Sequence, residues 1–502
     1  MAKYKYYDYS QSALIPVCLE EQIMPGTLEF AIHTLVETRV NMSIFDDRYN
    51  NDETGRWAYD PKVLLKVVLL AYSRGLISSR KIERACRENV TFMALSCMQR
   101  PDHSTIAAFV SSMKEEILPL FRDVLLVCEE ENLLGGTFFA LDGCRVSSNA
   151  STQWSGTISD FQRKKEKLEQ KIGQLLEEHL EEDKDGKGEG SSGTWNRKKQ
   201  IERLKKKAER IEEFVKNNRP KIGKQGREIQ SNITDNESCK MKSSHGIIQG
   251  YNGQALVDNK HQVILHAEVF GDAQDHHLIP PVLDGAKENM EAIGQGEDYF
   301  EGTIFTADSN YHDPTNLKKC EEEKMDAYIP DNRFRNRDPR FQSEKRNRHR
   351  RADRFSLKDF QHNEEADVYL CPRGKILRRN AKKAVVDGVI YRRYAADKNA
   401  CKGCELKAKC IRGKNGKRRV ISVAVGHVPG NLTKAMMEKV DSENGRKIYP
   451  QRMAIVEPVF ANIEIHKGMN RFTLREKIKV NIQWLLYCMV HNMGKIMAYG
   501  VP

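Results

Sequence analysis

The 502-residue chain lacks the long apolar segments that membrane-spanning and secreted proteins carry. Its longest apolar runs, such as VLLKVVLLAY (Val63–Tyr72), are too short and too interrupted to span a bilayer. The opening MAKYKYYDYSQ contains no apolar core of a signal peptide. We therefore expect no membrane contact and a cytoplasmic location.

Two further features of the sequence limit the cofactors that we expect. The chain has no G-x4-G-K-[ST] phosphate-binding loop, so we expect no nucleotide cofactor. It has 12 cysteines. Without a leader, these cysteines indicate a reducing compartment, in which thiols are free or bound to metal rather than paired in disulfides.

Positive charge is in excess. The chain has 82 Lys and Arg against 70 Asp and Glu, a formal net charge of +12. A basic balance makes nucleic acid the first partner to consider, although solvated Lys and Arg occur on any soluble protein.

Residues 60 to about 134 have the pattern of helices. An apolar stripe (Val63, Leu64, Val67, Val68 and Ala71) follows Pro61, which suits the first turn of a helix. Polar breaks separate it from SRKIERACREN, which Ser78 or Ser79 would cap, and from IAAFVSSMKEEILPLFRDVLLV. Such short helices fit either a helix-turn-helix unit or a packing bundle.

The run TFFALDGCRVSSNA begins a different pattern. Phe138 to Leu141 predict a buried strand that ends on Asp142. Asp before Gly is common where a strand turns, but a carboxylate at a strand end is also a typical metal ligand.

The elements that follow predict the order of an RNase H-like α/β core. Two strand-like runs, Gly250–Asp258 and His261–Phe270, precede a helix from about 275 to 292. A strand ending on Asp308 and a strand at Asp326–Pro330 complete the order. In this core the first and fourth strands are neighbours, which would bring Asp142 and Asp308 together; the alternative is two ordinary turn aspartates.

The gap between these strands predicts an inserted antiparallel helical hairpin. Ile201, Leu204, Ala208, Ile211 and Val215 form one apolar seam; Phe161, Leu168, Ile172 and Leu175 form the other, interrupted by Lys165. EEDKDGKGEGSSG between them has the composition of a flexible loop.

Two clusters follow. Residues 331–354 are rich in Arg, with Phe334 and Phe341 interleaved and Phe355 next, which suits phosphate contacts and stacking on unpaired bases; the alternative is a solvated loop. Cys371, Cys401, Cys404 and Cys410 fit a structural Zn²⁺ site, although the spacing before Cys410 is looser than a second C-x2-C and free thiols are the alternative.

The C-terminal stretch Ile448–Met497 is helical in period on both sides of a break at HKGMNRF. Ile478, Ile482, Leu485, Leu486 and Met489 predict a core stripe. Tyr449, Arg452 and Glu457 precede the break and could form an ordinary solvated face.

Several stretches resemble DDE transposases of bacterial insertion sequences and occur in the same order as in that family. Among these transposases, the stretches most resemble the group of insertion sequence 1182. They are SSRKIERACRENVTFMALS with PDHSTIAAF, DGCRVSSNAS, SNITDNESCKMK, GYNGQALVD, TADSNY and YPQRMAIVEPVF. The resemblance covers the chain from about residue 50 onward.

The resemblance implies that Asp142, Asp308 and Glu457 bind two divalent ions, Mg²⁺ or Mn²⁺. It places the Tyr-Arg-Glu signature of the family on Tyr449, Arg452 and Glu457, and we expect Tyr449 and Arg452 at the DNA. A Lys often follows the Glu by seven positions; here Glu464 stands there, and Lys467 is the expected substitute.

By the same resemblance, water first frees a 3′-OH at the transposon end, and this hydroxyl then attacks target DNA. The expected partners are double-stranded DNA, at the terminal inverted repeats and in the target, and a second copy of the chain in a homodimeric DNA complex near the bacterial nucleoid. The alternatives are a repressor that has lost catalysis and a structure-specific nuclease that cuts without joining.

Two sets of residues are the expected DNA contacts outside the catalytic core. Arg80, Arg84 and Arg87, with Lys81 beside them, lie on one helical face, whereas Ile82 and Ala85 turn inward. The rival set, in the basic stretch, is Arg346, Arg348, Arg350 and Arg351.

The expected domain limits follow from these patterns. They are an N-terminal segment (1–55), a helical DNA-binding domain (56–134), the first part of the core (135–157 and 227–330), the inserted hairpin (158–226), a basic and Cys-rich insertion (331–445) and C-terminal helices that complete the core (446–502).

Overall fold

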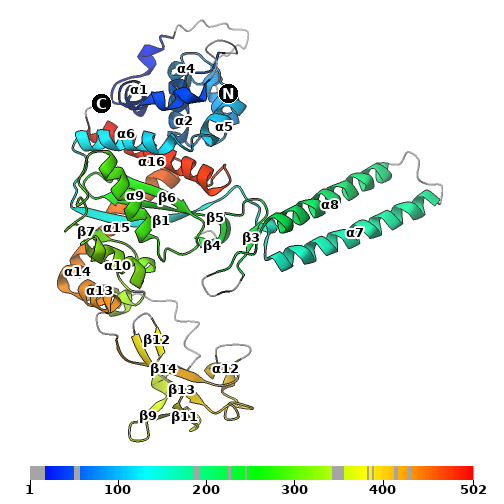
Figure 1. The fold of residues 1–502 in the computed structure, drawn as a ribbon, viewed down its shortest axis with the longest axis vertical. Coiled ribbons are helices and arrows are strands. Elements are labelled where there is room, and N and C mark those ends of the chain that lie inside the picture. The colour runs from blue at the N-terminus through cyan, green and yellow to red at the C-terminus, as the bar shows by residue number, and fades with distance from the viewer. Residues whose placement is uncertain are drawn as a thin grey trace, which may run out of the picture.

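A computed structural model gives the fold of the chain. It describes residues 17–49, 57–184, 192–223, 226, 228–243, 246–341, 355–380, 384–386, 389–411, 416–427 and 431–500. Helices of the N-terminal part lie at one end, a central sheet follows, a long helical hairpin projects sideways, and a small sheet lies at the other end (Figure 1). None of the helices in the described part combines the length and the apolar character needed to cross a bilayer.

Six helices form the N-terminal part: α1 (Leu28–Thr38), α2 (Pro61–Ser73), α3 (Ser79–Glu88), α4 (Val90–Leu95), α5 (His103–Ser111) and α6 (Ile117–Glu130). Helix α2 begins as predicted, because the Asp60 side chain accepts a hydrogen bond from the Lys62 N–H (2.8 Å) and Pro61 follows it. It is buried on every side, not along one stripe only. Helix α1 already packs on this core, although it lies in the segment before residue 56.

The central sheet has the strand order β4-β5-β1-β7-β8, with β6 also paired to β5. Its strands are β1 (Phe138–Ser147), β4 (Cys239–Ser243), β5 (Gly246–Asp258), β6 (Ile264–Phe270), β7 (Ile304–Thr306) and β8 (Asp326–Tyr328). Strand β1 is antiparallel to β5 and parallel to β7, so the first and fourth predicted strands are indeed neighbours. Strand β1 continues beyond Asp142 to Ser147, however, because its pairing with β5 continues; Asp142 stands inside the strand, not at its end.

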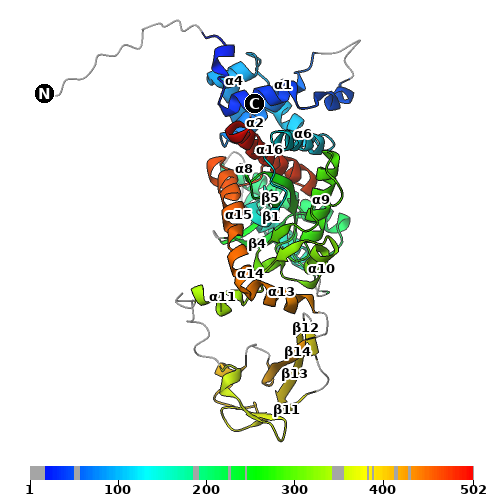
Figure 2. The same cartoon turned by 90° about the vertical axis from the view of Figure 1, so that its left-hand side faces the viewer.

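Helices cover both faces of this sheet. They are α9 (Ile279–Ala292), α10 (Pro314–Glu322), α13 (Leu432–Asp441), α14 (Glu443–Ile448), α15 (Gln451–Ala461) and α16 (Lys477–Tyr499). Figure 2 shows α15 on one side of the sheet and α9 and α10 on the other. The C-terminal α16 lies between the sheet and the N-terminal helices, and its Trp484 indole N–H donates to the Gln254 carbonyl (3.0 Å).

The predicted core stripe of α16 is largely correct. Ile482, Leu485, Leu486 and Met489 are buried, but Ile478 is 52 % exposed because it lies in the first turn, before the helix enters the core.

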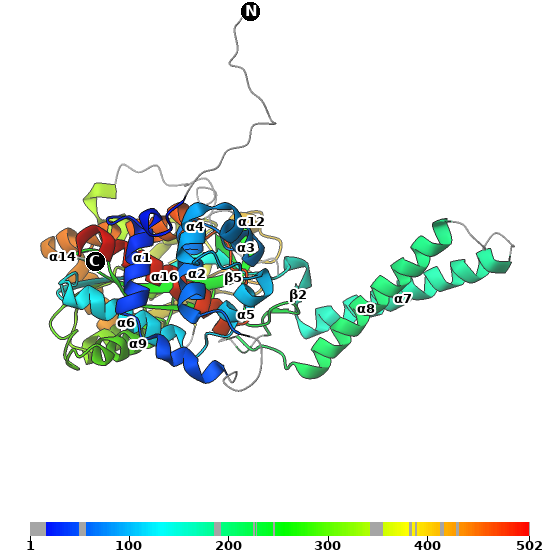
Figure 3. The same ribbon diagram turned by 90° about the horizontal axis from the view of Figure 1, so that it is seen from above.

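The inserted hairpin consists of α7 (Ile158–Lys184) and α8 (Ser192–Asn217), and it projects from the body of the molecule (Figure 3). Its base is closed by Phe161, Ile211 and Phe214, which form a small core of their own. Lys165, which interrupts the seam, pairs with Glu212 across the hairpin (3.0 Å). The predicted flexible loop falls largely on residues 185–191, which lie outside the described residues.

The small sheet is built from β9 (Gln361–Asn363), β10 (Val368–Leu370), β11 (Ile376–Arg379), β12 (Ala384–Val386), β13 (Val389–Ala396) and β14 (Val420–His427). Its order is β12-β13-β11-β10-β9, with β14 paired to β13. A core separate from the main one holds it together, with Tyr369, Leu377 and Tyr394 among the buried side chains. The short helix α12 (Lys407–Cys410) lies beside it.

The basic stretch is only partly described, since residues 342–354 lie outside the described residues, with Arg346, Arg348, Arg350 and Arg351 among them. Its described part includes α11 (Phe334–Arg337). Two arginines there form ion pairs with acids of the chain: Arg337 Nε lies 2.5 Å from Asp441 Oδ2, and Arg340 Nη2 lies 2.5 Å from Asp338 Oδ2.

Two of the three aromatic rings near this stretch do not support the expected stacking on bases. Phe334 is buried and meets the Tyr449 ring edge-on, with centroids 5.4 Å apart. Phe355 packs against the core of the small sheet. These two rings serve packing, because apolar side chains next to a core are buried in it.

Candidate active site

Asp142 and Asp308 lie at one cleft of the central sheet. Asp142 stands opposite Ala255 of β5, and Asp308 follows β7, whose parallel pairing with β1 reaches Thr306. Both carboxylates line a cleft of about 760 Å³. The pairing of β1 with β7 therefore gathers two acids from distant parts of the chain. We call this the acidic cleft.

The electrostatics of the acidic cleft favour a cation. Burial, and next the negative charge of Asp142, raises the pKa of Asp308 to about 6. Burial also raises the pKa of Asp142, whereas the guanidinium of Arg452 lowers it. A buried carboxylate beside a second negative charge is stabilised when a metal ion binds, and oxygen donors are those that Mg²⁺ prefers.

Arg452 and Tyr449 of the C-terminal part lie against the two acids. Arg452 Nη1 donates to Asp142 Oδ2 over 2.6 Å. Its Nε is buried and has no hydrogen-bond partner among the described residues. Tyr449 is close enough to Asp308 and Arg452 for both charges to affect its pKa, which burial raises. The structure thus gathers Asp142, Asp308, Tyr449 and Arg452.

Glu457 and Glu464 differ in their relation to the cleft. Glu457 is an exposed residue of α15 and is not among those that line the acidic cleft. Glu464 lines it, and interacts with Cys144 of β1 strongly enough to raise the pKa of that buried thiol further after burial itself. Glu464 belongs to a five-residue π-helical turn, Asn462–His466, that continues α15. Such turns shift the phase of a helix and are frequent at functional sites.

Asp275 is a further acid at the cleft, and sequence reasoning missed it. It is 7 % exposed, lines the cleft, and accepts hydrogen bonds from Asn252 Nδ2 (2.6 Å) and Gln254 Nε2 (3.1 Å). Its charge contributes to the raised pKa values of Asp142 and Asp308. Asp275 lies in the loop between β6 and α9, where no periodicity marks it.

Gly143, next to Asp142, is required by the same network. A Cβ at this position would lie 2.1 Å from the Gln254 side-chain nitrogen. Gln254 also accepts a hydrogen bond from the Tyr311 hydroxyl. Any side chain at residue 143 would therefore displace the amide that holds Asp275.

Lys467 is not among the residues that line the acidic cleft. It is 7 % exposed, and burial together with the nearby Lys495 ammonium lowers its pKa to about 8. Its backbone lies against Gly75, after α2. The expected role of Lys467 at the DNA stays a prediction.

Cys371, Cys401, Cys404 and Cys410 line one cavity of about 30 Å³ next to the small sheet. Gly374 and Gly403 have φ values of +71° and +74°, which allow the tight turns that follow Cys371 and precede Cys404. The Lys375 N–H donates to the Cys371 sulfur (3.4 Å). The pKa of Cys410 is raised by burial first and also by the other three thiols.

The fit of these donors to metals is partial. Four thiols are a donor set that suits Zn²⁺, and the carboxylates of the acidic cleft suit Mg²⁺. Within the described ranges, however, no three His, Cys, Asp or Glu side chains already stand in an arrangement that could hold a metal ion. In the acidic cleft, Arg452 occupies one oxygen of Asp142.

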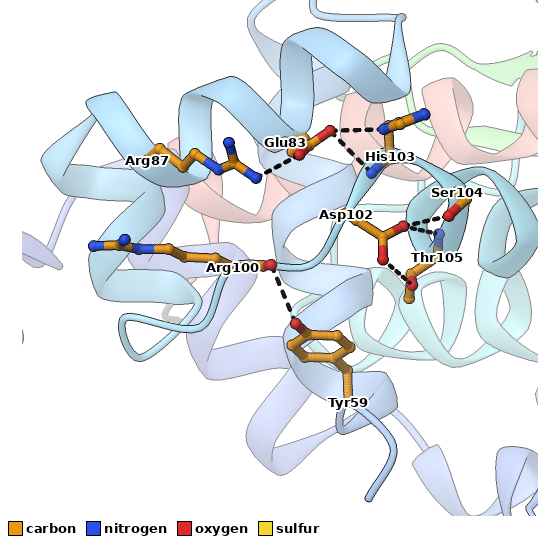
Figure 4. A network of polar contacts seen from close by, with 8 residues as sticks. All are labelled: Tyr59, Glu83, Arg87, Arg100, Asp102, His103, Ser104 and Thr105. Carbon is orange, nitrogen blue, oxygen red and sulfur yellow. Dashed lines mark hydrogen bonds and ion pairs between the residues drawn. The ribbon is translucent and has the colours of Figure 1, made fainter. Parts of the chain in front are cut away.

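The predicted arginine face of α3 is exposed, but two of its three arginines form ion pairs with acids. Arg84 Nε lies 2.8 Å from Glu88 Oε1, and Arg87 Nη2 lies 2.6 Å from Glu83 Oε1. Glu83 also contacts the His103 ring (2.8 Å), which ties α3 to α5 (Figure 4). Arg80 and Lys81 are exposed as well.

The inward side of α3 differs slightly from the prediction. Ile82 and Cys86 are buried, whereas Ala85 is only partly buried. In the same network, the Asp102 side chain caps α5 by accepting a hydrogen bond from the Thr105 N–H (2.8 Å) (Figure 4).

Two family models match the chain. The one described as "Transposase DDE domain" matches residues 370–497, and the one described as "Transposase domain (DUF772)" matches residues 17–112. The first match includes Glu457 and Glu464 but begins after Asp142 and Asp308. No curated protein matches the chain, and no solved structure does.

Both descriptions name transposases, the class to which the acidic cleft and the basic charge also point. Together the two matches support a DDE transposase of an insertion sequence. Transposases act on DNA, which supports DNA as a partner, and the DDE family implies a metal-dependent enzyme that cuts and joins DNA. The two matches do not distinguish the group of insertion sequence 1182 from others.

Proposed function

We propose that the protein binds the ends of its insertion sequence, cleaves DNA strands there and transfers the freed ends into target DNA. The observation that carries the proposal is the acidic cleft, which Asp142 and Asp308 line from neighbouring parallel strands, with Arg452 of α15 hydrogen-bonded to Asp142 beside it. An arginine among acids suits a phosphodiester, because the acids need a cation and the arginine binds phosphate.

The proposed catalytic core is RNase H-like. The order β6-β5-β1-β7-β8 supports this, with three antiparallel strands followed by two that run parallel to β1. The insertion between β1 and β4 and the one after β8 leave this order intact, since both project away from the sheet (Figure 1).

Asp142, Asp308 and a glutamate would hold Mg²⁺ or Mn²⁺. Bound there, two such ions activate the attacking oxygen and stabilise the leaving oxygen of an in-line phosphodiester displacement. The family resemblance assigns the glutamate position to Glu457, whereas the geometry of the cleft offers Glu464. Asp275, held by Asn252 and Gln254, adds negative charge beside the ligands.

Two residues beside the cleft would position the DNA. The buried Nε of Arg452 has no hydrogen-bond partner in the described part of the chain while Nη1 holds Asp142, and a phosphate oxygen would satisfy this donor. Tyr449 packs against Phe334 and lies near Arg452, which limits the conformations open to that guanidinium. We assign both residues to phosphate positioning.

The test uses DNA that carries the inverted repeats bracketing this reading frame, with Mg²⁺ or Mn²⁺ and a target plasmid. A transposase produces 3′-OH ends at the repeats and then joined products. Cleavage without joining would indicate a structure-specific nuclease, and binding without cleavage would indicate a repressor; either result contradicts the proposal. Sizing the end complex tests the proposed homodimer.

A further inference from the structure

A second cleft adjoins the acidic cleft. It has a volume of about 710 Å³ and shares Ser147 and Asn470 with the acidic cleft, so the two are continuous. None of the residues that line it, among those that the structure describes, is acidic, whereas three are arginines: Arg210, Arg471 and Arg475. We call it the basic groove.

Two of these arginines are oriented by neutral acceptors. Arg471 Nη2 donates to Asn149 Oδ1 (3.2 Å), and Arg475 Nε donates to the Asn149 carbonyl (2.8 Å). Asn149 is itself held by its side-chain N–H, which donates to the Thr473 carbonyl (2.8 Å). In the described part of the chain neither guanidinium forms an ion pair with a carboxylate, so the positive charge of both is uncompensated.

The third arginine comes from the inserted hairpin. Arg210 of α8 lies over the Trp154 ring, 5.3 Å from its centroid, and Lys164 of α7 lies 4.7 Å from the same centroid. Trp154 packs on the small core at the base of the hairpin. Its indole therefore contacts one cation from each helix, and of the two Arg210 lines the groove.

We propose that the basic groove holds the DNA backbone that continues from the phosphate bound in the acidic cleft. Arg210, Arg471 and Arg475 contact successive phosphates, and Trp154 is a positioning residue for Arg210. The argument is continuity and opposite charge: a polyanion whose reacting phosphate lies at the acids must leave along a neighbouring surface, and arginines bind phosphate oxygens in a fork geometry.

This proposal rests on the proposed function and gives the inserted hairpin a role. Because Arg210 lies at its base, the hairpin contributes to the DNA path beside the cleft. The two parts of the proposed substrate site then differ in charge: carboxylates line the acidic cleft together with Arg145 and Lys242, whereas arginines without acids line the basic groove.

The test compares Arg471→Gln/Arg475→Gln and Arg210→Gln with the unchanged protein. Fluorescence anisotropy without added divalent ions measures binding of end DNA that stops at the cleavage point and of end DNA extended on either side of it. We expect the unchanged protein to bind one of the extended DNAs more tightly than the DNA that stops at the cleavage point. The variants should lose this gain in affinity. The slope of log K against log salt should flatten by about 0.7 to 0.9 for each phosphate that a variant no longer binds.

Matched variants separate the groove from general charge. Arg203→Gln removes the same charge from α8 outside the groove and should leave the gain intact. Arg471→Lys/Arg475→Lys keeps the charge and should restore part of it. If the double Gln variant fails to fold, Arg210→Gln alone decides, since its side chain is exposed on α8.

Two outcomes would overturn the proposal: groove variants that bind extended DNA as tightly as the unchanged protein, or an equal loss with Arg203→Gln. Because binding is measured apart from cleavage, failure here differs from failure of the proposed function. The latter would appear as cleavage without joining, or as binding without cleavage, by the unchanged protein.

Discussion

The acidic cleft and the four-cysteine cavity both collect candidate metal ligands, and they draw them from different distances along the chain. The acids come from β1, from the end of β7 and from the turn after α15, and the main sheet brings them together. The thiols come from two tight turns and α12, all beside the small sheet. One site is built on the main sheet and its large core, whereas the other lies beside a small core of its own.

This difference predicts opposite consequences of ligand loss. Removing an acid from a rigid sheet should leave the fold intact and remove the chemistry. Removing a thiol from a small domain should affect folding first, because domains with little core rely on metals or disulfides.

The largest expected effect is at the cysteines. We predict that Cys371, Cys401, Cys404 and Cys410 bind one Zn²⁺ per chain and that its removal unfolds the small sheet. Apparent binding free energies of structural Zn²⁺ in zinc-finger peptides are about 10–16 kcal/mol, well above the stability of a core this small. Metal analysis and thiol titration of purified protein check this.

The matched control is Cys97→Ser, since Cys97 is exposed and lies in the turn after α4 of the N-terminal part. It should leave the zinc content unchanged, whereas Cys404→Ser should lower it. Protein without zinc, in which all four thiols titrate freely, would contradict the prediction.

The next largest effect is at the acids. We predict that Asp142→Ala and Asp308→Ala each reduce strand cleavage by more than about a hundredfold, because loss of an outer partner of a metal ligand alone costs about 10- to 100-fold. Binding to the ends should remain, since basic contacts supply most of the affinity. Cleavage and gel-shift assays on the same protein samples measure both quantities.

Asp298→Ala is the control for this pair, because Asp298 is an exposed acid away from the cleft. A variant of Asp142 that loses DNA binding and unfolds at a lower temperature would show that the acid is structural.

The third prediction concerns which glutamate is the third metal ligand at the acidic cleft. Glu457→Ala and Glu464→Ala separate the residue that the family resemblance assigns from the residue that lines the cleft. If Glu457 is the third ligand, its variant loses cleavage and end binding remains. Normal cleavage by Glu457→Ala with loss of cleavage by Glu464→Ala would assign the position to Glu464 instead.

Much of this arrangement could be predicted from the sequence. Phe138–Leu141 and the strand before Asp308 are apolar runs in a recognisable order, so their parallel neighbours could be inferred. The hairpin seams could be read from their spacing, and Ile201 and Ile211 are buried as predicted. These features are local or depend on the order of the elements, and both can be inferred from the periodicity of apolar residues.

What could not be predicted depends on tertiary contacts. Strand β1 continues beyond Asp142 because its pairing with β5 continues there. A π-helical turn places Glu464 at the cleft. Asp275 arrives on a loop whose position is set by Asn252 and Gln254. Lys467 is buried near Lys495, and its backbone packs against Gly75 after α2. This contact between distant parts of the chain could not be predicted from residue spacing.

The smallest expected effect extends the comparison from where DNA is cut to where its sequence is read. The exposed arginines of α3 lie within the match to the second transposase domain. Arg84 is paired with Glu88, but exposed ion pairs of this kind contribute little to stability, so DNA can compete for the guanidinium. Buried Ile82 and Cys86 fix the helix so that Arg80 and Arg84 face outward.

We predict that Arg80→Ala and Arg84→Ala weaken binding to the true end more than binding to random duplex, by about 1–3 kcal/mol for each base that the variant no longer reads. Replacing Arg348, Arg350 and Arg351 should weaken both about equally and flatten the salt dependence, as expected for phosphate contacts. Competition binding with end and random duplexes at several salt concentrations distinguishes the two patterns. If the first pair leaves the preference for the end unchanged, the N-terminal helices serve packing or dimerisation, and the sequence of the end is read elsewhere.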